Sequence, residues 1–311
     1  MTNKPKIIII GGPTAVGKSA LAVNLAEKFN GEIVSADSMQ IYKNLDVGTA
    51  KPSAEERQGI PHYLLDFLSP ETPYSVADFT AAADPLLQAS REINDILDKN
   101  KLPIVVGGTA LYLNALINGM NFSDADRSDK VRDKWKKIAS ESGNQFVYDH
   151  LIEIDPESAA KISVNDTKRI IRAIEIFEVT GKPKSQSATT AICPYDYAFF
   201  IMTRERTELY AAIETRVDKM FEDGLINEVK SLETYKNYQS MQAIGYKQLC
   251  EYFDSKFDSI ESVKNEIKKL SRNYAKRQMT FFRGMNANKN FIDYLNATTE
   301  VSKAVTEFLA Y

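Results

Sequence analysis

The chain has 311 residues, with 43% hydrophobic and 26% charged side chains and a formal net charge of −3. This composition is ordinary for a globular protein that has either one large domain with an insertion or two domains. No apolar run approaches the roughly 18 residues that a membrane span needs, and the roughly four apolar residues after Lys6 are too few for a signal-peptide core. We therefore expect a cytoplasmic protein that does not engage membranes. The two histidines and two widely spaced cysteines argue against a histidine-based metal site.

Residues 6–19, KIIIIGGPTAVGKS, predict a strand, a glycine-rich loop and the start of a helix. The loop fits the pattern G-x4-G-K-[ST], in which backbone N–H groups and a helix N-terminus surround an anion. Lys18 supplies a mobile cation, and the Ser19 hydroxyl can bind Mg²⁺. A chance glycine-rich turn is the alternative, but strand, loop and helix follow in the order that the motif requires. The predicted di- or triphosphate site consists of Gly12, Pro13, Thr14, Ala15, Val16, Gly17, Lys18 and Ser19.

The apolar spacing of residues 19–29 predicts a helix that Gly31 closes, and residues 32–35 predict the next strand. Asp37 then lies just beyond the carboxyl end of a parallel strand, which is the edge where open α/β sheets bind ligands. It is a candidate for Mg²⁺ coordination or for general-base work beside the phosphates. A helix N-cap is an equally good interpretation, because aspartate is a preferred cap.

Two turn-rich segments follow, residues 46–52 and 61–70, and long irregular segments in compact domains are often functional. His62 lies in the second segment, where a packed or solvated side chain is the more common outcome than a ligand. Residues 75–99 predict a helix with a break or kink at Pro85.

Residues 102–117, LPIVVGGTALYLNALI, predict a second strand, glycine turn and helix that face the same sheet edge. Many phosphate-loop ATPases end such a strand with a metal-binding aspartate. Here Gly-Gly-Thr follows instead, so that Thr109 brings a hydroxyl rather than a carboxylate. This weakens an ATPase interpretation without excluding a kinase.

From about residue 121 the parallel-strand pattern stops, and it resumes at residues 197–203. We therefore expect a helical insertion over 121–196, within a catalytic core of residues 1–120 and 197–311. A helix that starts at Asn165 or Asp166 carries cations in its first two turns, Lys168, Arg169 and Arg172. Because cations there oppose the helix dipole, a clamp over a diphosphate is favoured over a solvated basic face.

The last long predicted helix, about residues 261–285, and the residues after it are strongly basic. Glu266 is the one acid among the cations Lys264, Lys268, Lys269, Arg272, Lys276, Arg277, Arg283 and Lys289. Interleaved aromatic residues, Tyr274, Phe281 and Phe282, suit the bases and phosphates of RNA. A merely soluble helix face is the alternative.

Taken together, the motifs resemble those of the tRNA dimethylallyltransferases, which prenylate the adenosine immediately 3′ of the tRNA anticodon. The matching segments are GGPTAVGKS, SADSMQIY, DVGTAKP, PHYLLD, VGGTALYL, NDTKRIIRA, QAIGYKQL and YAKRQMTFFRG. The resemblance spans roughly residues 6–285. It implies an α/β fold with a P-loop kinase-like parallel sheet flanked by helices and an inserted helical domain. It also implies that the loop holds the diphosphate of dimethylallyl diphosphate.

The resemblance implies roles for single residues as well. Asp37 matches the group that draws a proton from the exocyclic amine of adenine. The leaving diphosphate is neutralised by Lys18, by Mg²⁺ on Ser19 and by Arg216, and Thr109 lies at the reaction channel.

The same resemblance implies an anticodon stem-loop of tRNA as the partner, with the target base flipped into the pocket. The matching tRNA positions are Asp37, Ser38, Met39, Gln40, Thr109, Arg132, Lys168, Arg169, Ile170, Ile171, Arg172, Gln242, Ala243, Ile244, Gly245, Tyr246, Lys247, Arg277, Gln278, Met279, Thr280, Phe281, Phe282, Arg283 and Gly284.

Three positions depart from the family pattern, Val16, Ala110 and Phe281, and none removes a group that the chemistry needs. The chain lacks the zinc-finger extension of eukaryotic relatives, so a bacterial type is expected, and nothing requires a dimer, so we expect a monomer. A nucleotide or small-molecule kinase with the same loop and a non-catalytic RNA-binding module are the alternatives.

Overall fold

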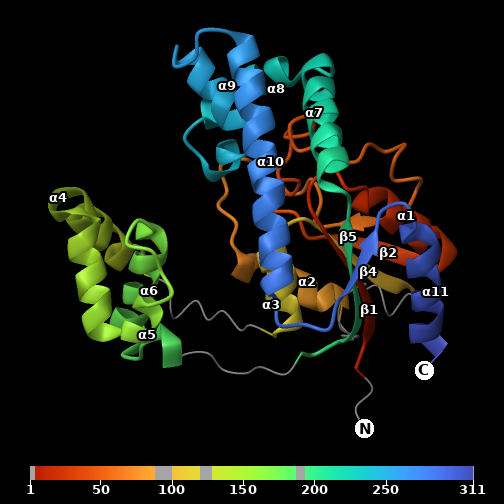
Figure 1. Cartoon of the computed structure of the whole chain (residues 1–311), viewed down its shortest axis with the longest axis horizontal. Coiled ribbons are helices and arrows are strands. Elements are labelled where there is room, and N and C mark those ends of the chain that lie inside the picture. Colours follow the sequence, from red (N-terminus) through yellow and green to blue (C-terminus); the bar gives the residue numbers. More distant parts are fainter. Residues whose placement is uncertain (1–3, 88–99, 120–127, 187–192, 311) are drawn as a thin grey trace. The chain divides into compact units, whose positions relative to one another are not determined.

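The structure is a computed structural model that describes residues 4–87, 100–119, 128–186 and 193–310 (Figure 1). The chain divides into two compact units. The first unit joins Met1–Ile117 to Cys193–Tyr311, and the second is Asn118–Ile192. The sequence predicted the corresponding insertion over 121–196.

The first unit is built on a six-stranded sheet with the order β3-β2-β4-β1-β5-β6, in which every neighbouring pair is parallel. The predicted α/β fold is therefore confirmed. The strands are β1 (Lys6–Gly11), β2 (Gly31–Ser35), β3 (His62–Tyr63), β4 (Leu102–Val106), β5 (Asp196–Thr203) and β6 (Asn290–Asp293).

The register of β1 and β4 brings the two glycine turns together. Ile8 pairs with Ile104 and Ile10 with Val106, so both strands end at the same level and continue directly into glycines. From β1 the chain moves to one side, to β2, and from the neighbouring β4 it moves to the other side, to β5, so a topological switch point lies between the carboxyl ends of β1 and β4. The fold thus offers a ligand crevice between these two turns.

Alternating side chains of β1 divide the core into two layers. Ile8 and Ile10 belong to the layer that contains side chains of α1 (Lys18–Lys28) and α11 (Ala297–Ala310), which lie together beside the sheet (Figure 1). Ile7 and Ile9 belong to the opposite layer, as the period of two in a strand requires. The helices of that layer include α2 (Val76–Leu87), α3 (Ala110–Ile117) and α10 (Ile260–Gly284).

Two details of these elements differ from the sequence-based expectation. Asn30, not Gly31, adopts the left-handed conformation after α1, with φ of 53°, because asparagine tolerates that region. Gly31 instead opens β2, where a Cβ atom would lie 2.9 Å from the Leu102 carbonyl oxygen. The helix expected over 75–99 is present as α2 with Pro85 inside it, and residues 88–99 lie outside the described part of the chain.

Long helices continue the first unit beyond the sheet. The remaining elements are α7 (Arg206–Glu222), α8 (Leu225–Ser231), η3 (Glu233–Tyr235), η4 (Gln239–Gln242) and α9 (Tyr246–Phe253). Figure 1 shows α7 and the long α10 side by side.

The pairing of α7 with α10 corrects the expected charge of the basic helix. Lys264 and Lys268 each lie 2.7 Å from Asp218 of α7, and Arg272 lies 2.5 Å from Glu214 of the same helix. Two acids that are distant in sequence therefore pair with three of the eight cations of the apparent charge run, and the cations without such partners include those toward its C-terminal end.

The insertion unit is helical. It consists of α4 (Asp129–Ile154), α5 (Pro156–Ala159), α6 (Thr167–Thr180) and η2 (Lys184–Gln186). Asp166 caps α6 through Arg169 N, and Gly181 ends it in the left-handed conformation. A buried carboxylate, Glu175, joins α6 to α4 by accepting from Ser128 N at 2.8 Å and from Arg132 Nε at 2.9 Å.

None of the helices in the described ranges combines the length and apolarity that crossing a membrane requires.

Candidate active site

The phosphate loop joins β1 to α1 through backbone conformations that the glycines permit. Gly17 is left-handed at φ of 94°, and a Cβ atom on Gly12 would lie 2.7 Å from the Met202 carbonyl oxygen. Lys18 opens α1 and donates from Nζ to the Pro13 carbonyl at 2.6 Å. The motif therefore has the strand, loop and helix order that the sequence predicted, with N–H groups gathered at a helix N-terminus.

The second glycine turn, after β4, packs against the end of β2. A Cβ atom on Gly107 would lie 2.0 Å from the Ala36 carbonyl oxygen, so no other residue fits. Gln278 of α10 joins the two turns, because its Oε1 accepts from Thr14 N at 3.0 Å while its Nε2 donates to the Gly108 carbonyl at 2.8 Å. Gln278 is thus a brace between the two turns, although it was expected to contact RNA.

Asp37 lies two residues after β2, and its carboxylate can serve both as a local cap and as a group for the chemistry of the site. Its Oδ1 accepts from Met39 N at 2.9 Å and Gln40 N at 3.2 Å, which is a local capping role. The Thr109 hydroxyl accepts from Ser38 N at 3.0 Å and so ties this turn to the second glycine turn. The second carboxylate oxygen, Oδ2, is not part of these bonds, so capping leaves it available for chemistry.

The phosphate loop, the Asp37 turn and Gln278 share one cavity of about 360 Å³, whereas Thr109 contacts its lining through Ser38 without lining it itself. Side chains from the phosphate loop, the Asp37 turn, the loop 46–51, α7 and α10 line it. The predicted site residues that it brings together are Thr14, Lys18, Ser19, Asp37, Ser38, Met39, Gln40, Arg216, Gln242, Ala243, Ile244, Arg277 and Gln278. A volume of this size suits a small-molecule ligand.

Two cations and one acid set the electrostatics of the cavity. Burial, followed by repulsion from Arg216, lowers the pKa of Lys18 to about 7, while Asp37 pulls it upward. Burial also lowers the pKa of Arg216, and Asp37 again opposes this. Because a bound anion would relieve both effects, the site is built to receive negative charge.

Tyr274 of α10 lies within reach of the same charges. Burial raises the pKa of its phenol, and the Asp37 charge raises it further. The hydroxyl therefore stays protonated at neutral pH. It can donate a hydrogen bond inside the cavity. From the sequence, Tyr274 was expected only as one of the aromatic residues among the cations of the basic helix.

The apolar part of the cavity wall comes from α7 and α10. Ile213, Val217 and Met220 from α7 and Ile267 from α10 line the cavity with apolar side chains. They were not anticipated, because on sequence they are indistinguishable from the core positions of any amphipathic helix. The cavity therefore offers a polar, anion-seeking part and an apolar part.

His62 also lines the cavity, which favours a ligand-binding role over that of a packed or solvated side chain. Its Nδ1 lies 2.8 Å from the Ile60 carbonyl, an arrangement that makes Nδ1 the donor and Nε2 the acceptor. Burial lowers the pKa of the ring, so the neutral form prevails at pH 7.

Several expected RNA contacts need correction because their side chains are buried. Ile170 and Ile171 lie in the core of the insertion unit, and Tyr246 and Phe282 lie in the core of the first unit. The side chains of these four residues hold their helices in place and cannot stack on RNA. Phe281, by contrast, is 39% exposed.

The remaining basic positions have mixed environments. Arg277 lies over the Tyr274 ring at 5.9 Å and lines the cavity. In the insertion unit, Lys168 and Arg169 are exposed, whereas Arg132 and Arg172 are half-buried and both bond to Glu175. The last two are therefore held in fixed orientations.

The oxygen atoms at the cavity are compatible with a magnesium ion. Ser19, Ser35 and Asp37 all line it, and oxygen ligands are those that Mg²⁺ prefers. Among the described residues no group of three or more His, Cys, Asp or Glu side chains forms a ready-made metal site. The Ser19 hydroxyl is the protein ligand that the phosphate-loop geometry favours.

Comparison with known proteins agrees with this geometry. The profile of the family described as IPP transferase matches residues 40–285. Proteins named tRNA dimethylallyltransferase are 45% identical in Thermoanaerobacter sp. (strain X514) and 44% identical in Caldanaerobacter subterraneus subsp. tengcongensis, each over 98% of both chains.

Solved structures agree as well. The full-length tRNA isopentenylpyrophosphate transferase of Bacillus halodurans has a TM-score of 0.73 and 39% identity, over 99% of this chain and 97% of that one. A eukaryotic dimethylallyltransferase acting on tRNA has a TM-score of 0.81 and 29% identity, over 98% of this chain and 80% of that one. These similarities support a prenyltransferase over the kinase alternative, and the chain belongs to the IPP transferase family of tRNA dimethylallyltransferases.

Proposed function

We propose that the enzyme transfers a dimethylallyl group from dimethylallyl diphosphate to the exocyclic amine of the adenosine 3′-adjacent to the anticodon, and releases diphosphate. The observation that carries this proposal is one cavity whose lining brings Asp37 together with Lys18 and Arg216, and whose lining residue Ser38 donates to the Thr109 hydroxyl. A proton acceptor and an anion site are the two requirements of a displacement in which an amine attacks and a diphosphate leaves.

The polar part of the cavity suits the diphosphate. The N–H groups of the phosphate loop and the Lys18 ammonium would hold its oxygens, and the Arg216 guanidinium would face the charge that grows as the C–O bond breaks. Mg²⁺, when bound by Ser19 and the diphosphate oxygens, would neutralise the leaving group further.

The apolar part suits the prenyl tail. Ile213, Val217, Met220 and Ile267 offer a hydrocarbon surface without a charge, and burying a branched five-carbon tail there releases water from both surfaces. The same walls exclude water from the allylic carbon, which protects the donor from hydrolysis.

The incoming amine would meet Asp37. The amine nitrogen forms a bond to the allylic carbon of the donor, the bond from that carbon to the diphosphate oxygen breaks, and the amine proton passes to the Asp37 carboxylate. Because Oδ1 is engaged by Met39 N and Gln40 N, Oδ2 is the oxygen that is free of these bonds to take the proton. The Thr109 hydroxyl, fixed by Ser38 N, can bond to the base or to the bridging oxygen.

The partner would be the anticodon stem-loop of a tRNA, with its base flipped into the cavity. Arg277 and the exposed Phe281 on α10, and the cations of the insertion unit, offer phosphate and stacking contacts. We expect the enzyme to reach this substrate in the cytoplasm.

The decisive assay incubates the protein with Mg²⁺, labelled dimethylallyl diphosphate and unmodified tRNA. Label should move to the RNA in the wild type, and Asp37→Asn should lose transfer while it keeps donor binding. Absence of transfer, together with phosphorylation of a small molecule from ATP, would replace the proposal by a kinase. RNA binding without either reaction would leave only a binding module.

A further inference from the structure

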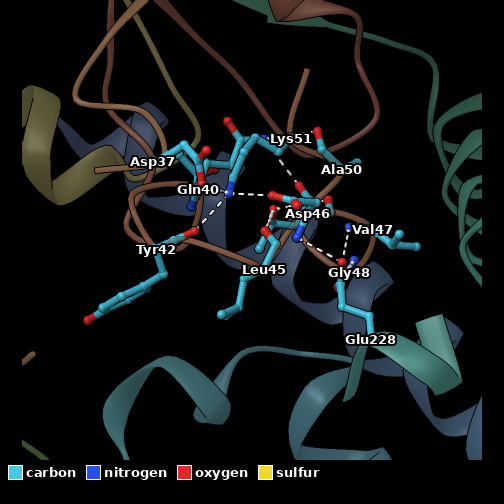
Figure 2. Close-up of polar contacts among 12 residues, drawn as sticks. Asp37, Gln40, Tyr42, Leu45, Asp46, Val47, Gly48, Ala50, Lys51 and Glu228 are labelled. Carbon is cyan, nitrogen blue, oxygen red and sulfur yellow. Dashed lines mark hydrogen bonds and ion pairs between the residues drawn. The ribbon is translucent and has the colours of Figure 1, made fainter. Parts of the chain in front are cut away.

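A short loop beside the cavity, residues 46–51, is held from below by one carboxylate (Figure 2). Asp46 N and Val47 N donate to Oε2 of Glu228 at 3.0 and 2.8 Å, and Gly48 N donates to Oε1 at 3.1 Å. The Tyr246 hydroxyl donates to the same Oε1 at 2.5 Å. Three consecutive backbone donors and one phenol thus converge on a single acceptor, and these four donors are all neutral.

The base of this arrangement is rigid. A Cβ atom on Gly48 would lie 2.4 Å from the Tyr246 ring, so the loop rests directly on that ring. Tyr246 is completely buried, and Glu228 belongs to α8, whose neighbours Leu225 and Val229 are core residues. The loop therefore has little freedom on the side that faces Glu228.

The other side of the same loop contacts the cavity. The carbonyl of Thr49 accepts from the Arg216 guanidinium at 3.0 Å and from Gln40 Nε2 at 3.1 Å. Gln40 Nε2 also donates to the Ala50 carbonyl at 3.1 Å. Arg216 and Gln40 both line the cavity, whereas Glu228 does not. Glu228 holds the N–H group of Gly48, and the carbonyl of the next residue, Thr49, orients Arg216 and Gln40. One peptide unit, between Gly48 and Thr49, therefore separates the two sets of bonds.

We infer that Glu228 is a positioning residue, which fixes the loop 46–51 and thereby holds the Arg216 guanidinium at the diphosphate and Gln40 at the incoming base. The inference rests on the proposed function of the cavity. Glu228 acts through hydrogen bonds of the backbone and touches neither substrate, so that its loss changes geometry rather than the chemical groups present.

The test uses Glu228→Gln in the full-length protein. The carboxamide keeps the shape and one acceptor oxygen but turns an N–H₂ group toward at least one backbone donor. We expect kcat/KM for dimethylallyl diphosphate to fall about 10- to 100-fold, with binding of inorganic diphosphate weakened about tenfold in calorimetry. The urea midpoint should fall modestly, because at least one backbone donor loses its acceptor. Glu233→Gln, an exposed carboxylate five positions along the chain, is the control for the change in charge and should match the wild type.

Two further variants separate positioning from mere structural support. Tyr246→Phe keeps the ring under Gly48 and removes one bond, so it should show a smaller loss in the same direction. In an Arg216→Met background, Glu228→Gln should weaken diphosphate binding less than about twofold, because the group that it positions is gone.

Additive effects of Glu228→Gln and Arg216→Met would overturn the inference. So would a lowered urea midpoint with wild-type diphosphate binding. Diphosphate binding needs no tRNA and no transfer, so a wild type that fails to prenylate tRNA would refute the proposed function while the role of Glu228 is still decided by calorimetry.

Discussion

The lowered pKa of Lys18 makes donor binding sensitive to pH in a calculable way. Burial and Arg216 bring this pKa from 10.5 to about 7 in the free protein. As the pH rises through 7, Lys18 loses its proton, and the proton must be restored when a diphosphate binds, because the anion favours the charged amine. Binding above pH 7 is therefore linked to uptake of one proton.

The magnitude follows from the protonated fraction. That fraction is about one half at pH 7, about one eleventh at pH 8 and about one hundredth at pH 9. The affinity for a diphosphate should therefore fall about fivefold from pH 7 to 8 and about tenfold more from pH 8 to 9. The pKa of Arg216 is also lowered, but the ordinary pKa of arginine is far higher than that of lysine. Arg216 therefore stays charged over this pH range.

The assay is calorimetry of inorganic diphosphate binding at pH 7, 8 and 9 in buffers with different ionisation enthalpies, which reports proton uptake directly. Lys18→Met should bind weakly and lose the uptake that Lys18 contributes, whereas Lys28→Met, at the other end of α1, should behave as the wild type. Because the unfolded lysine keeps its ordinary pKa, the charged form of Lys18 costs stability near neutral pH, and Lys18→Met should also raise the unfolding temperature. Affinity that is independent of pH, or equal proton uptake in Lys18→Met, would show that Lys18 is not the group that titrates.

Four other substitutions probe the account. Asp37→Asn retains an acceptor for Met39 N and should lower kcat at least about 100-fold with little effect on urea unfolding; retained turnover with lost stability would leave only the cap role. Gln278→Ala leaves Thr14 N and the Gly108 carbonyl unpaired, so stability should fall by about 2 kcal/mol and donor binding should weaken, which unchanged calorimetry would contradict. Arg277→Ala should lower tRNA affinity and reduce its salt slope by about one; an unchanged slope counts against a phosphate contact. Glu175→Ala strands two half-buried arginines and should destabilise the insertion unit by about 3 kcal/mol in thermal unfolding, and since the bonds to Glu175 lower its pKa against the effect of burial, the wild-type contribution should fade as the pH drops below 4.5.

Local signals in the sequence predicted the parts of the site that depend on near neighbours. The phosphate loop is a contiguous stretch whose glycines and helix start can be interpreted without knowing the rest of the chain. The turns that carry Asp37 and Thr109 meet, as the sequence predicted, because parallel strands end at a common edge.

The parts that depend on tertiary packing could not be predicted in the same way. Gln278 looked like one more polar residue of a basic helix, yet it braces the two glycine turns. Asp218 and Glu214 neutralise cations more than forty positions away, so counting charges along α10 overstated its basic character. Glu228 lies in a short helix without any motif, and only the fold reveals the three N–H groups from which it accepts hydrogen bonds.

The apolar residues of the cavity wall also could not be recognised from the sequence. Ile213, Val217 and Ile267 have the helical spacing of ordinary core residues, and each is almost entirely inaccessible to solvent. Periodicity shows which face of a helix is buried but not whether that face meets another side chain or a ligand cavity.

The most direct measurement of the central claim is the position of the transferred group. After single-turnover reaction of the enzyme with Mg²⁺, dimethylallyl diphosphate and an unmodified anticodon stem-loop, the RNA is digested to nucleosides and analysed by mass spectrometry, while released diphosphate is counted. We expect a dimethylallyl group on the exocyclic amine of the adenosine that follows the anticodon, with one diphosphate released per modified base. Diphosphate release without modified adenosine, or modification at any other base, would contradict it.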